Sequence, residues 1–282
     1  MYKILEKTQF SEKVFKFRIE APAIAKHAHA GQFLMVRANE TGERVPFTLA
    51  GWNGDEGWVE FIFMVIGKTT EMLSTYEAGE SLRDVVGPLG VPTEMAEGPC
   101  AVIGGGVGLA IAFPVAKHLV ETGHEVHAIM GARTKDLLLM EDQFRELLDE
   151  DHIHITTDDG SYGEKGVVTA PLEKKIVEGA NFDEVITIGP LIMMKFVVKT
   201  TKPHNVKTVV SMNPIMVDGT GMCGGCRLTV GGETKFACVD GPDFDGDLVD
   251  FDEAMARGTM YRPFEAKARE KACNLFKTEE AK

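Results

Sequence analysis

Alternation of apolar and polar side chains predicts strands over residues 1–97. The segment Val14–Glu20, VFKFRIE, places apolar and charged residues at alternate positions, which is the period of a half-buried strand. Further apolar runs begin at Gly31, Trp58 and Ser81, and Gly, Asn and Pro turns separate them. The pattern predicts an antiparallel sheet or a small barrel.

From Gly98 onward the pattern changes to an alternation of strands and helices. The expected strands are short apolar runs that span residues 100–104, 126–130, 152–157, 184–188 and 207–212. The expected helices lie between them, at residues 108–121, 136–148, 171–178 and 191–200. This order predicts a parallel, doubly wound sheet, in which ligands bind at the carboxyl ends of the strands.

Composition and charge narrow the class of protein. The chain has 282 residues, and at roughly 150 residues per domain this length suggests about two domains. Its net charge of −13 argues against a nucleic-acid partner. The amino-terminal segment carries charges every few residues and lacks the apolar region of a signal peptide, so we expect a cytoplasmic protein. Residues 98–116 are uncharged, but glycines and Pro114 interrupt them, which argues against a membrane span.

Glycine-rich or polar segments follow the expected strands of the second region. They are Gly104–Gly108, Gly131–Arg133, Asp158–Gly160 and Gly189–Pro190. The first of these, GGGVG, would let a dinucleotide approach the amino end of the next helix. It departs from the dehydrogenase fingerprint G-x-G-x-x-G, because Leu109 and Ile111 stand where a glycine is needed. Arg133 fits either a contact to a 2′-phosphate or an ordinary surface position, so the choice between NAD and NADP stays open.

Two short motifs in the first region carry candidate chemistry. Arg44–Thr48, RVPFT, is expected at the end of a strand and combines a guanidinium, an aromatic ring and a hydroxyl. Gly67–Thr70, GKTT, follows an apolar strand, so its N–H groups and hydroxyls can bind a pyrophosphate at a helix amino end. It is not a Walker A loop, because Ile62 stands where that loop requires glycine. Each motif alone is more often a turn than a site.

A cysteine-rich segment lies in the last quarter of the sequence. In it, Asp218, Cys223, Cys226 and Cys238 follow the spacing D-x4-C-x2-C-x11-C. A plant-type [2Fe–2S] cluster is held by C-x4-C-x2-C and a distant fourth cysteine, so aspartate here takes the first place. Glycines between the cysteines allow the backbone to wrap closely round a cluster and to present N–H groups to its sulfides. We interpret the stretch as a [2Fe–2S] site.

Other readings of the same cysteines remain. Structural zinc prefers four Cys or His ligands, and a second ligand pair is absent from the sequence. The Gly-Gly pair between Cys223 and Cys226 opposes the helix of a redox C-x2-C motif, and a disulfide needs an oxidising compartment. Asp218 precedes a glycine, as an ordinary turn residue also does. The eight histidines are scattered along the chain and suggest no metal site.

In this order the motifs resemble the ferredoxin–NADP reductase superfamily over almost the whole chain. More narrowly, the chain resembles iron–sulfur electron-transfer subunits: the small (alpha) subunit of NADH-dependent reduced ferredoxin:NADP oxidoreductase, and the subunit that serves dihydroorotate dehydrogenase. The resemblance implies three parts. These are a FAD-binding antiparallel β-barrel at 1–97, an NAD(P)-binding α/β domain at 98–212, and a [2Fe–2S] subdomain with the tail at 213–282.

The resemblance also implies roles for single residues. Thr48 would hydrogen-bond the isoalloxazine as the catalytic residue, and Arg44 would bind the flavin phosphates. The other implied flavin contacts are Pro46, Phe47, Gly67, Lys68, Thr69 and Thr70. The implied or expected nucleotide contacts are Gly105, Gly106, Gly108, Arg133, Asp158, Gly189 and Pro190.

Two departures from the family pattern bear on function. Ile188 replaces the cysteine that commonly precedes Gly-Pro, and Asp218 replaces a cysteine of the dihydroorotate dehydrogenase subunits. The second departure favours a resemblance to the small subunit of NADH-dependent reduced ferredoxin:NADP oxidoreductase. That resemblance implies an oxidoreductase subunit in which FAD and a [2Fe–2S] cluster link NAD(H) to a larger iron–sulfur flavoprotein partner, within an electron-bifurcating complex. The alternative is an electron-transfer subunit of an NAD-linked dihydroorotate dehydrogenase. An alternative from another functional class is a zinc-stabilised nucleotide-binding module without a redox role.

Overall fold

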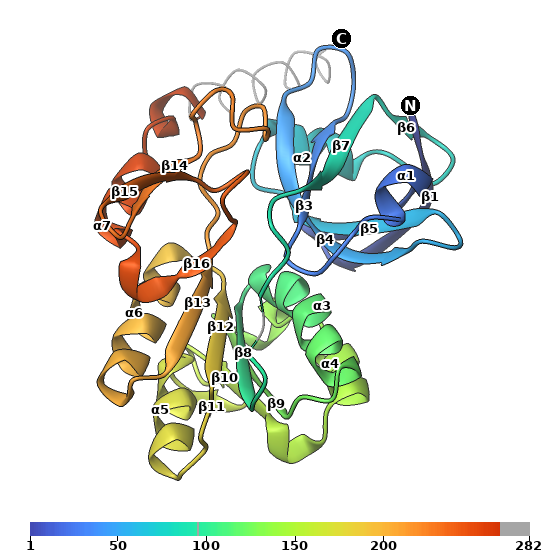
Figure 1. Cartoon of the computed structure of the whole chain (residues 1–282). Coiled ribbons are helices and arrows are strands. Elements are labelled where there is room, and N and C mark those ends of the chain that lie inside the picture. The colour runs from blue at the N-terminus through green and yellow to red at the C-terminus, as the bar shows by residue number, and fades with distance from the viewer. Residues whose placement is uncertain (95, 266–282) are drawn as a thin grey trace.

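The chain forms two large sheets and a smaller carboxyl-terminal part that touches both (Figure 1). The computed structural model describes residues 1–94 and 96–265. The part of the expected carboxyl-terminal tail that spans residues 266–282 lies outside the described residues.

The first sheet is antiparallel, has seven strands and curves into a nearly closed barrel, as the sequence predicts. Its strand order is β6-β1-β2-β5-β4-β3-β7. The strands are β1 (Tyr2–Ser11), β2 (Val14–Glu20), β3 (Phe33–Arg37), β4 (Arg44–Asn53), β5 (Trp58–Met64), β6 (Ser81–Leu82) and β7 (Asp84–Leu89). Two short helices, α1 (Pro22–Ala25) and α2 (Lys68–Ser74), lie between them.

The apolar positions of the alternating strands form the barrel core. Phe17 of β2 packs edge-on against Phe61 and Phe63 of β5, and all three rings are buried. One expectation about this sheet is wrong: Arg44–Thr48 begins β4 instead of ending a strand. The motif therefore lies within a paired ladder, opposite β3.

The second sheet also has seven strands, in the order β11-β10-β9-β8-β12-β13-β16. Its parallel strands are β8 (Cys100–Gly105), β9 (Val126–Ala132), β10 (Ile153–Thr157), β11 (Glu164–Lys165), β12 (Glu184–Ile188) and β13 (Lys207–Ser211). After β10 and β11 the chain returns to pair β12 with β8, so the strand order reverses between β8 and β12. Ligands of doubly wound sheets bind outside the carboxyl ends at this reversal.

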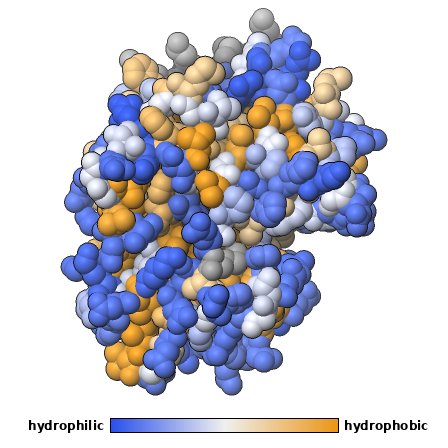
Figure 2. All heavy atoms as spheres, in the orientation of Figure 1, coloured by the Kyte–Doolittle hydropathy of each residue, from blue (hydrophilic) through white to orange (hydrophobic). Residues whose placement is uncertain are grey.

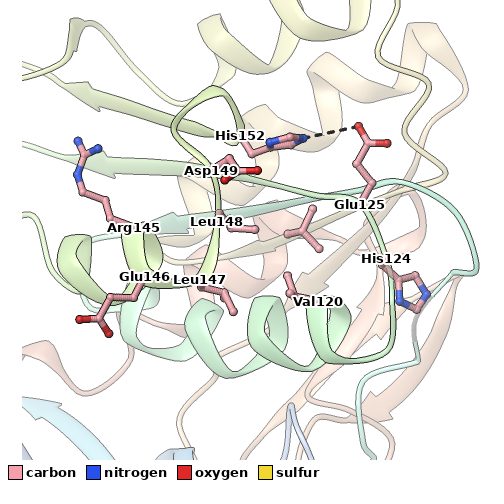
Figure 3. Close-up of a pocket in the computed structure, with 10 residues that line it drawn as sticks. Val120, His124, Glu125, Arg145, Glu146, Leu147, Leu148, Asp149 and His152 are labelled. Carbon is pink, nitrogen blue, oxygen red and sulfur yellow. Dashed lines mark ion pairs between the residues drawn. The ribbon is translucent and has the colours of Figure 1, made fainter.

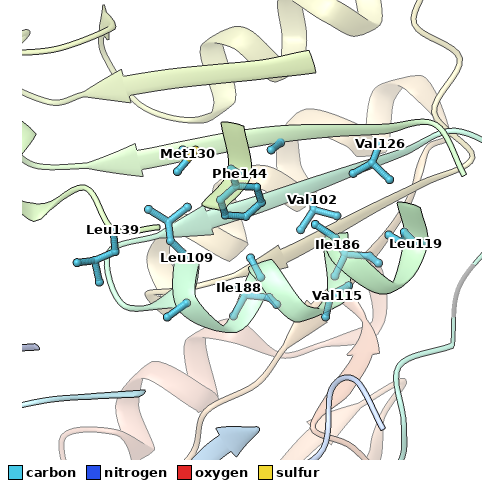
Figure 4. Packing of buried hydrophobic residues seen from close by; sticks show 14 of the residues in the cluster. Val102, Leu109, Val115, Leu119, Val126, Met130, Leu139, Phe144, Ile186 and Ile188 are labelled. Atoms are coloured by element: carbon cyan, nitrogen blue, oxygen red, sulfur yellow. The ribbon is translucent and has the colours of Figure 1, made fainter. Parts of the chain in front are cut away.

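Helices cover both faces of the second sheet. They are α3 (Gly108–Glu121), α4 (Glu141–Leu147), α5 (Thr169–Val177) and α6 (Leu191–Thr201), with 3₁₀ turns at Lys135–Leu137, Glu150–His152 and Lys202–His204. Figure 4 shows the α3 face, where Leu109 and Val115 of α3 and Phe144 of α4 pack on Val102 and Ile186 of the sheet. The opposite face packs on α5 and α6 through residues such as Leu172 and Val197.

The helix expected at 136–148 is shorter than predicted. A 3₁₀ turn is followed by a break at Met140, whose φ of 63° is left-handed, before α4 begins. The break lets Leu139 enter the core beside α3, and this burial outweighs the local helical preference.

The carboxyl-terminal part joins both sheets. It holds the hairpin β14 (Arg227–Val230) and β15 (Glu233–Phe236), strand β16 (Asp243–Asp245), a 3₁₀ turn at Gly246–Leu248 and helix α7 (Phe251–Arg257). Strand β16 pairs antiparallel with β13 and completes the second sheet. The hydrophobic core of this carboxyl-terminal part also includes Phe33 and Met35 of the barrel. The carboxyl-terminal part therefore packs against both sheets.

The outer surface is mainly hydrophilic, with a few apolar patches (Figure 2). Among the described residues, no helix combines the length and the apolar character needed to cross a membrane. The cytoplasmic location stays a prediction from the sequence.

Candidate functional site

The loop before β14 and the turn after β15 bring Asp218 and the three predicted cysteine ligands together in two pairs. Cys223 Sγ donates to Asp218 Oδ1 at 3.0 Å, and Cys226 Sγ lies 3.2 Å from Cys238 Sγ. Cys226 and Cys238 are buried, whereas Cys223 is exposed. Three sulfur donors and one carboxylate therefore lie in one loop system, which is a donor set that suits an iron–sulfur cluster.

Backbone N–H groups point at the sulfur atoms. The N–H of Gly221 donates to Cys238 Sγ at 3.2 Å, and that of Gly225 donates to Cys223 Sγ at 3.4 Å. Such bonds stabilise thiolates and the sulfides of a bound cluster. The residues present therefore fit a [2Fe–2S] cluster.

The contacts of the Asp218 carboxylate and of the Cys238 thiol determine their protonation states. Bonds from Cys223, and from the Thr220 hydroxyl, hold the pKa of Asp218 at about 2, so this carboxylate is charged at neutral pH. Burial, together with neighbouring Cys226, raises the pKa of the Cys238 thiol to about 12. Cys238 therefore keeps its proton until a metal displaces it.

Glycine at position 219 places the loop directly against the barrel. Gly219 has a φ of +78°, and a Cβ there would lie 2.5 Å from Met35 Cγ of β3. Only a residue without a side chain allows both this backbone conformation and this close approach. The loop is thus held on the outer side of β3.

Strand β3 connects the cysteine loop with the RVPFT motif. Within the β3–β4 ladder, Phe33 faces Thr48 and Met35 faces Pro46. Phe33 and Met35 also belong to the same hydrophobic cluster as Cys226 and Cys238. One strand therefore separates the predicted flavin contacts from the predicted cluster ligands.

The aromatic ring of the motif is fixed by the barrel. Phe47 stacks on Phe61 of β5, with ring centroids 5.0 Å apart and planes 8° from parallel. This contact positions the first half of β4, including the half-buried Thr48 hydroxyl. Arg44, at the start of the strand, is exposed.

The GKTT turn forms the amino end of α2. Thr70 Oγ1 accepts bonds from the N–H groups of Ile66 and Gly67 at 3.0 and 3.1 Å, and donates to the Gly67 carbonyl. The Thr70 hydroxyl thus holds the turn. The N–H groups of Lys68 and Thr69 belong to the helix end, where no preceding carbonyl of the helix can accept them. A Cβ on Gly67 would meet nothing within 4 Å, which leaves space for an anion beside the turn.

The two motifs of the barrel also lie close to each other. Thr69 Oγ1 approaches Glu43 Oε2, next to Arg44, at 3.5 Å. The structure therefore brings the predicted phosphate-binding turn to the beginning of β4.

The glycine loop after β8 lies at the strand reversal of the second sheet. Ile188 of β12 pairs with Gly104 of β8, so Gly105–Gly108 and Gly189–Pro190 are neighbours. A Cβ on Gly108 would lie 2.1 Å from the Ile188 carbonyl oxygen, whereas one on Gly106, at φ +58°, would meet nothing within 4 Å. Gly108 thus allows α3 to begin against β12, and Gly106 leaves open space at the helix amino end.

Arg133 and Asp158 lie at the carboxyl ends of β9 and β10, next to this loop. The Asp158 N–H donates to the Ala132 carbonyl at 3.1 Å, and both Arg133 and Asp158 are exposed. All seven predicted nucleotide contacts therefore lie along one end of the sheet, the end at which doubly wound sheets bind nucleotides.

Sequence reasoning missed the residues that join these sites. Phe33 and Met35 were expected only as strand residues, and their contact with the cysteine loop depends on a pairing across about two hundred positions of chain. The tight packing of Gly219 on β3 also has no local signal beyond the glycine itself.

Two family models match parts of the chain. The iron–sulfur cluster binding domain of dihydroorotate dehydrogenase B matches residues 213–250, and the oxidoreductase NAD-binding domain matches residues 102–199. The matches confirm the predicted iron–sulfur and NAD-binding parts and disfavour a zinc-stabilised module without a redox role. A flavin is supported by a solved structure, 45% identical to this chain, that is described as an enzyme of flavin-based electron bifurcation. The ferredoxin reductase of carbazole 1,9a-dioxygenase shares the fold, with a TM-score of 0.59 at 17% identity over 73% of this chain and 65% of the other. The fold and the matched domains define a ferredoxin-reductase-like oxidoreductase with an iron–sulfur domain.

Closer relatives identify the family. The dihydroorotate dehydrogenase B (NAD(+)) electron transfer subunit homolog of Thermotoga maritima is 48% identical over 260 residues, which cover 92% of this chain and 91% of the relative. A solved structure of the NADH-dependent reduced ferredoxin-NADP oxidoreductase superposes with a TM-score of 0.89 at 45% identity, over 97% of this chain and 98% of the other. The chain belongs to the family of electron-transfer subunits that includes these proteins.

Proposed function

We propose that the chain is the subunit of an electron-bifurcating, NADH-dependent ferredoxin:NADP oxidoreductase that links NAD(H) to a larger iron–sulfur flavoprotein subunit through FAD and a [2Fe–2S] cluster. The single observation that carries the proposal is the position of β3, which touches the RVPFT motif on one side and the cysteine loop on the other. The likeness to the bifurcating enzyme extends over 97% of the chain and supports the choice of complex.

Each part of the chain has a distinct task in this function. Bound FAD would supply the conversion between the two-electron hydride of NADH and single electrons, which is chemistry of the cofactor itself. Thr48 orients the flavin ring by a hydrogen bond, and Arg44 with the Gly67–Thr70 turn binds its phosphates. The loop at Gly105, Gly106 and Gly108, together with Arg133, Asp158, Gly189 and Pro190, holds the nucleotide. Asp218, Cys223, Cys226 and Cys238 hold the cluster.

The surface around the cysteines suits the docking of the larger subunit. Met222 is 85% exposed, and Val217 and Val239 are also exposed large apolar side chains. Figure 2 shows apolar side chains on this side of the molecule, between the cysteine loop and the barrel. An apolar rim round an electron-transfer centre excludes water when a partner binds.

Service to a dihydroorotate dehydrogenase is the second candidate function. The family model that matches residues 213–250 and the name of the Thermotoga maritima relative favour it. Asp218 opposes it, because the subunits of that enzyme resembled here have cysteine at this position. Identification of the larger flavoprotein that copurifies with the chain separates the two.

The proposal is tested by an anaerobic absorbance titration of the purified protein with NADH, with flavin and iron measured in the same sample. We expect the flavin and iron–sulfur bands to bleach together as NADH is added. A colourless protein that holds zinc, or a protein that holds flavin but no iron after anaerobic reconstitution, would contradict the proposal.

A further inference from the structure

Three histidines in or just before two neighbouring strands converge at the opposite end of the second sheet from the nucleotide loop. His127 lies near the amino end of β9, His152 lies just before β10, and His154 follows within β10. Glu125 precedes β9 and faces the same cluster, as Figure 3 shows for Glu125 and His152. The sequence suggested no metal site among the scattered histidines, and the fold brings three of the eight together.

The distances between the Glu125 carboxylate and the two imidazoles are longer than good hydrogen bonds and closer to the spacing of ligands round one metal ion. Glu125 Oε1 lies 3.5 Å from His127 Nε2 and 3.9 Å from His152 Nε2, and one ligand atom from each of the three residues lies within 4.8 Å of the others. Good hydrogen bonds of this kind measure about 2.7–3.2 Å. Ligands at about 2.1 Å from a tetrahedral metal ion are roughly 3.4 Å apart, so a small closure of these side chains would complete a three-ligand site.

The buried ring of His127 is already oriented for such a role. Its Nδ1 lies 3.3 Å from Nε2 of His154, and its face packs edge-on with Phe182 at 5.3 Å. When His127 donates from Nδ1 to His154, its Nε2 presents a lone pair toward Glu125. Metal-binding histidines are commonly fixed in this way by a bond from their second ring nitrogen.

The cluster is also open to solvent on one side. A cavity of about 380 Å³ lies beside it, and Glu125, His152, His124 and Asp149 are among the residues that line it (Figure 3). The side chain of Glu125 is 59% exposed, and that of His152 is 32% exposed. Water can therefore reach the coordination position that the three side chains leave open.

We propose that Glu125, His127 and His152 form a binding site for a divalent transition-metal ion, best matched by zinc, with water as the remaining ligand. Two imidazoles and one carboxylate are a ligand set that zinc accepts. His154 is a positioning residue that orients His127. The site lies at the amino ends of β9 and β10, so a bound ion would join these ends without touching the nucleotide or the cysteine loop.

Two lysines near the cluster, Lys174 and Lys175, limit its affinity for a cation. The ammonium group of Lys175 on α5 acts electrostatically on His127 and His154, against a bound cation. Glu178 lies 3.9 Å from Lys175 Nζ and offsets part of this charge.

Equilibrium dialysis of the anaerobically purified full chain against zinc chloride tests the site, with zinc and iron measured by mass spectrometry. We expect one zinc per chain while the iron content stays unchanged, which excludes replacement of the cluster. His152→Gln and Glu125→Gln should each weaken zinc binding more than about 10-fold, and His154→Gln should weaken it about 10-fold through the orientation of His127. His204→Gln, at an exposed position away from the cluster, is the matched control and should bind as the unaltered chain does.

Two results would overturn the proposal. One is an unaltered chain that retains its iron and binds no zinc. The other is zinc bound as tightly by both His152→Gln and Glu125→Gln as by the His204→Gln control. Flavin and iron contents of each variant report that it has folded, and the exposed Glu125 gives a variant that leaves the core intact.

Discussion

Asp218 is the residue at which we predict a departure from all-thiolate cluster ligation. Its carboxylate is charged and already bonded to Cys223, so an oxygen donor is ready in the place of a fourth sulfur. We expect Asp218→Cys to retain the cluster but to change its midpoint potential, because ligand type sets the potential of such clusters. A redox titration followed by electron paramagnetic resonance measures the change.

The matched control for this prediction is Asp240→Asn. Asp240 accepts a bond from the Phe236 N–H and lies close to Cys238 in the sequence, so it tests the effect of a nearby charge alone. If both variants shift the potential equally, Asp218 is not a ligand.

The buried carboxyl of Asp243 in β16 should make the free energy of unfolding depend on pH. Burial raises the pKa of this carboxyl, and the hydroxyls of Ser211 and Thr93 offset only part of that effect. The folded chain therefore binds the proton more tightly than the unfolded chain, whose aspartates titrate near 3.9. It follows that the stability contributed by protonated Asp243 is complete below about pH 4 and is lost as the pH rises through the raised pKa.

The variant Asp243→Asn removes this loss. We expect it to increase the free energy of unfolding by about 1 kcal/mol at pH 7.5 and to have little effect at pH 4, because a buried charge is replaced by a neutral amide. Urea denaturation at the two pH values measures both quantities. Asp245→Asn, at an exposed position on the same strand, should change neither.

At the residue scale, spacing in the sequence identified the sites whose ligands lie close together in the chain. The cysteine loop is predictable because its donors fall within 21 positions. Asp243 and the histidine cluster were not predicted, since their burial and contacts depend on strands that are distant in sequence. The pattern His152-Ile153-His154 does place two imidazoles on one face of a strand, and this signal could have been used.

At the scale of elements, the start of α3 depends on one glycine. A methyl group at Gly108 would collide with the backbone of β12 at Ile188, so the helix would have to move away from the strand. We expect Gly108→Ala to lower stability by about 1–3 kcal/mol, as overpacking does, and to weaken NADH binding. Urea denaturation and an NADH titration measure the two effects.

Gly258→Ala is the control for this substitution. Its Cβ would make only ordinary contacts at 3.5 Å, and its φ of −61° suits any residue. NADH affinity that is unchanged in Gly108→Ala would show that the position of α3 does not determine nucleotide binding.

The elements themselves were largely predictable. The bounds of β2, α3 and β12 agree with the expected segments, because each has strong periodicity and clear ends. Strand β1 was not predicted, since its charges hide the alternation, and β16 was not predicted because a three-residue strand gains its stability from pairing with β13. The assignment of the three parts to 1–97, 98–212 and 213–282 stays a prediction.

At the scale of the whole molecule, the carboxyl-terminal part that carries the cysteines packs against both the barrel and the second sheet. We expect electron transfer to the larger subunit to depend on the apolar surface next to the cysteines. We expect Met222→Glu to slow electron transfer to the larger subunit about 10-fold or more, because a charge would be buried on docking. Reduction of a small artificial acceptor by NADH should not change.

Val177→Glu provides the comparison for this prediction. Val177 ends α5 and is 72% exposed, so the same charge is introduced on an equally apolar position away from the cysteine loop. Equal losses in the two variants would mean that the surface round Met222 has no special role in docking.

The pairing of β16 with β13 has a consequence for the life of the protein in a cell. Strand β16 follows the segment that carries the cysteines, and it covers an edge of the second sheet by pairing with β13. An uncovered strand edge invites aggregation and proteolysis. A chain whose last strand fails to pair would therefore expose that edge, and we expect it to be removed before it could occupy the partner in an inactive complex.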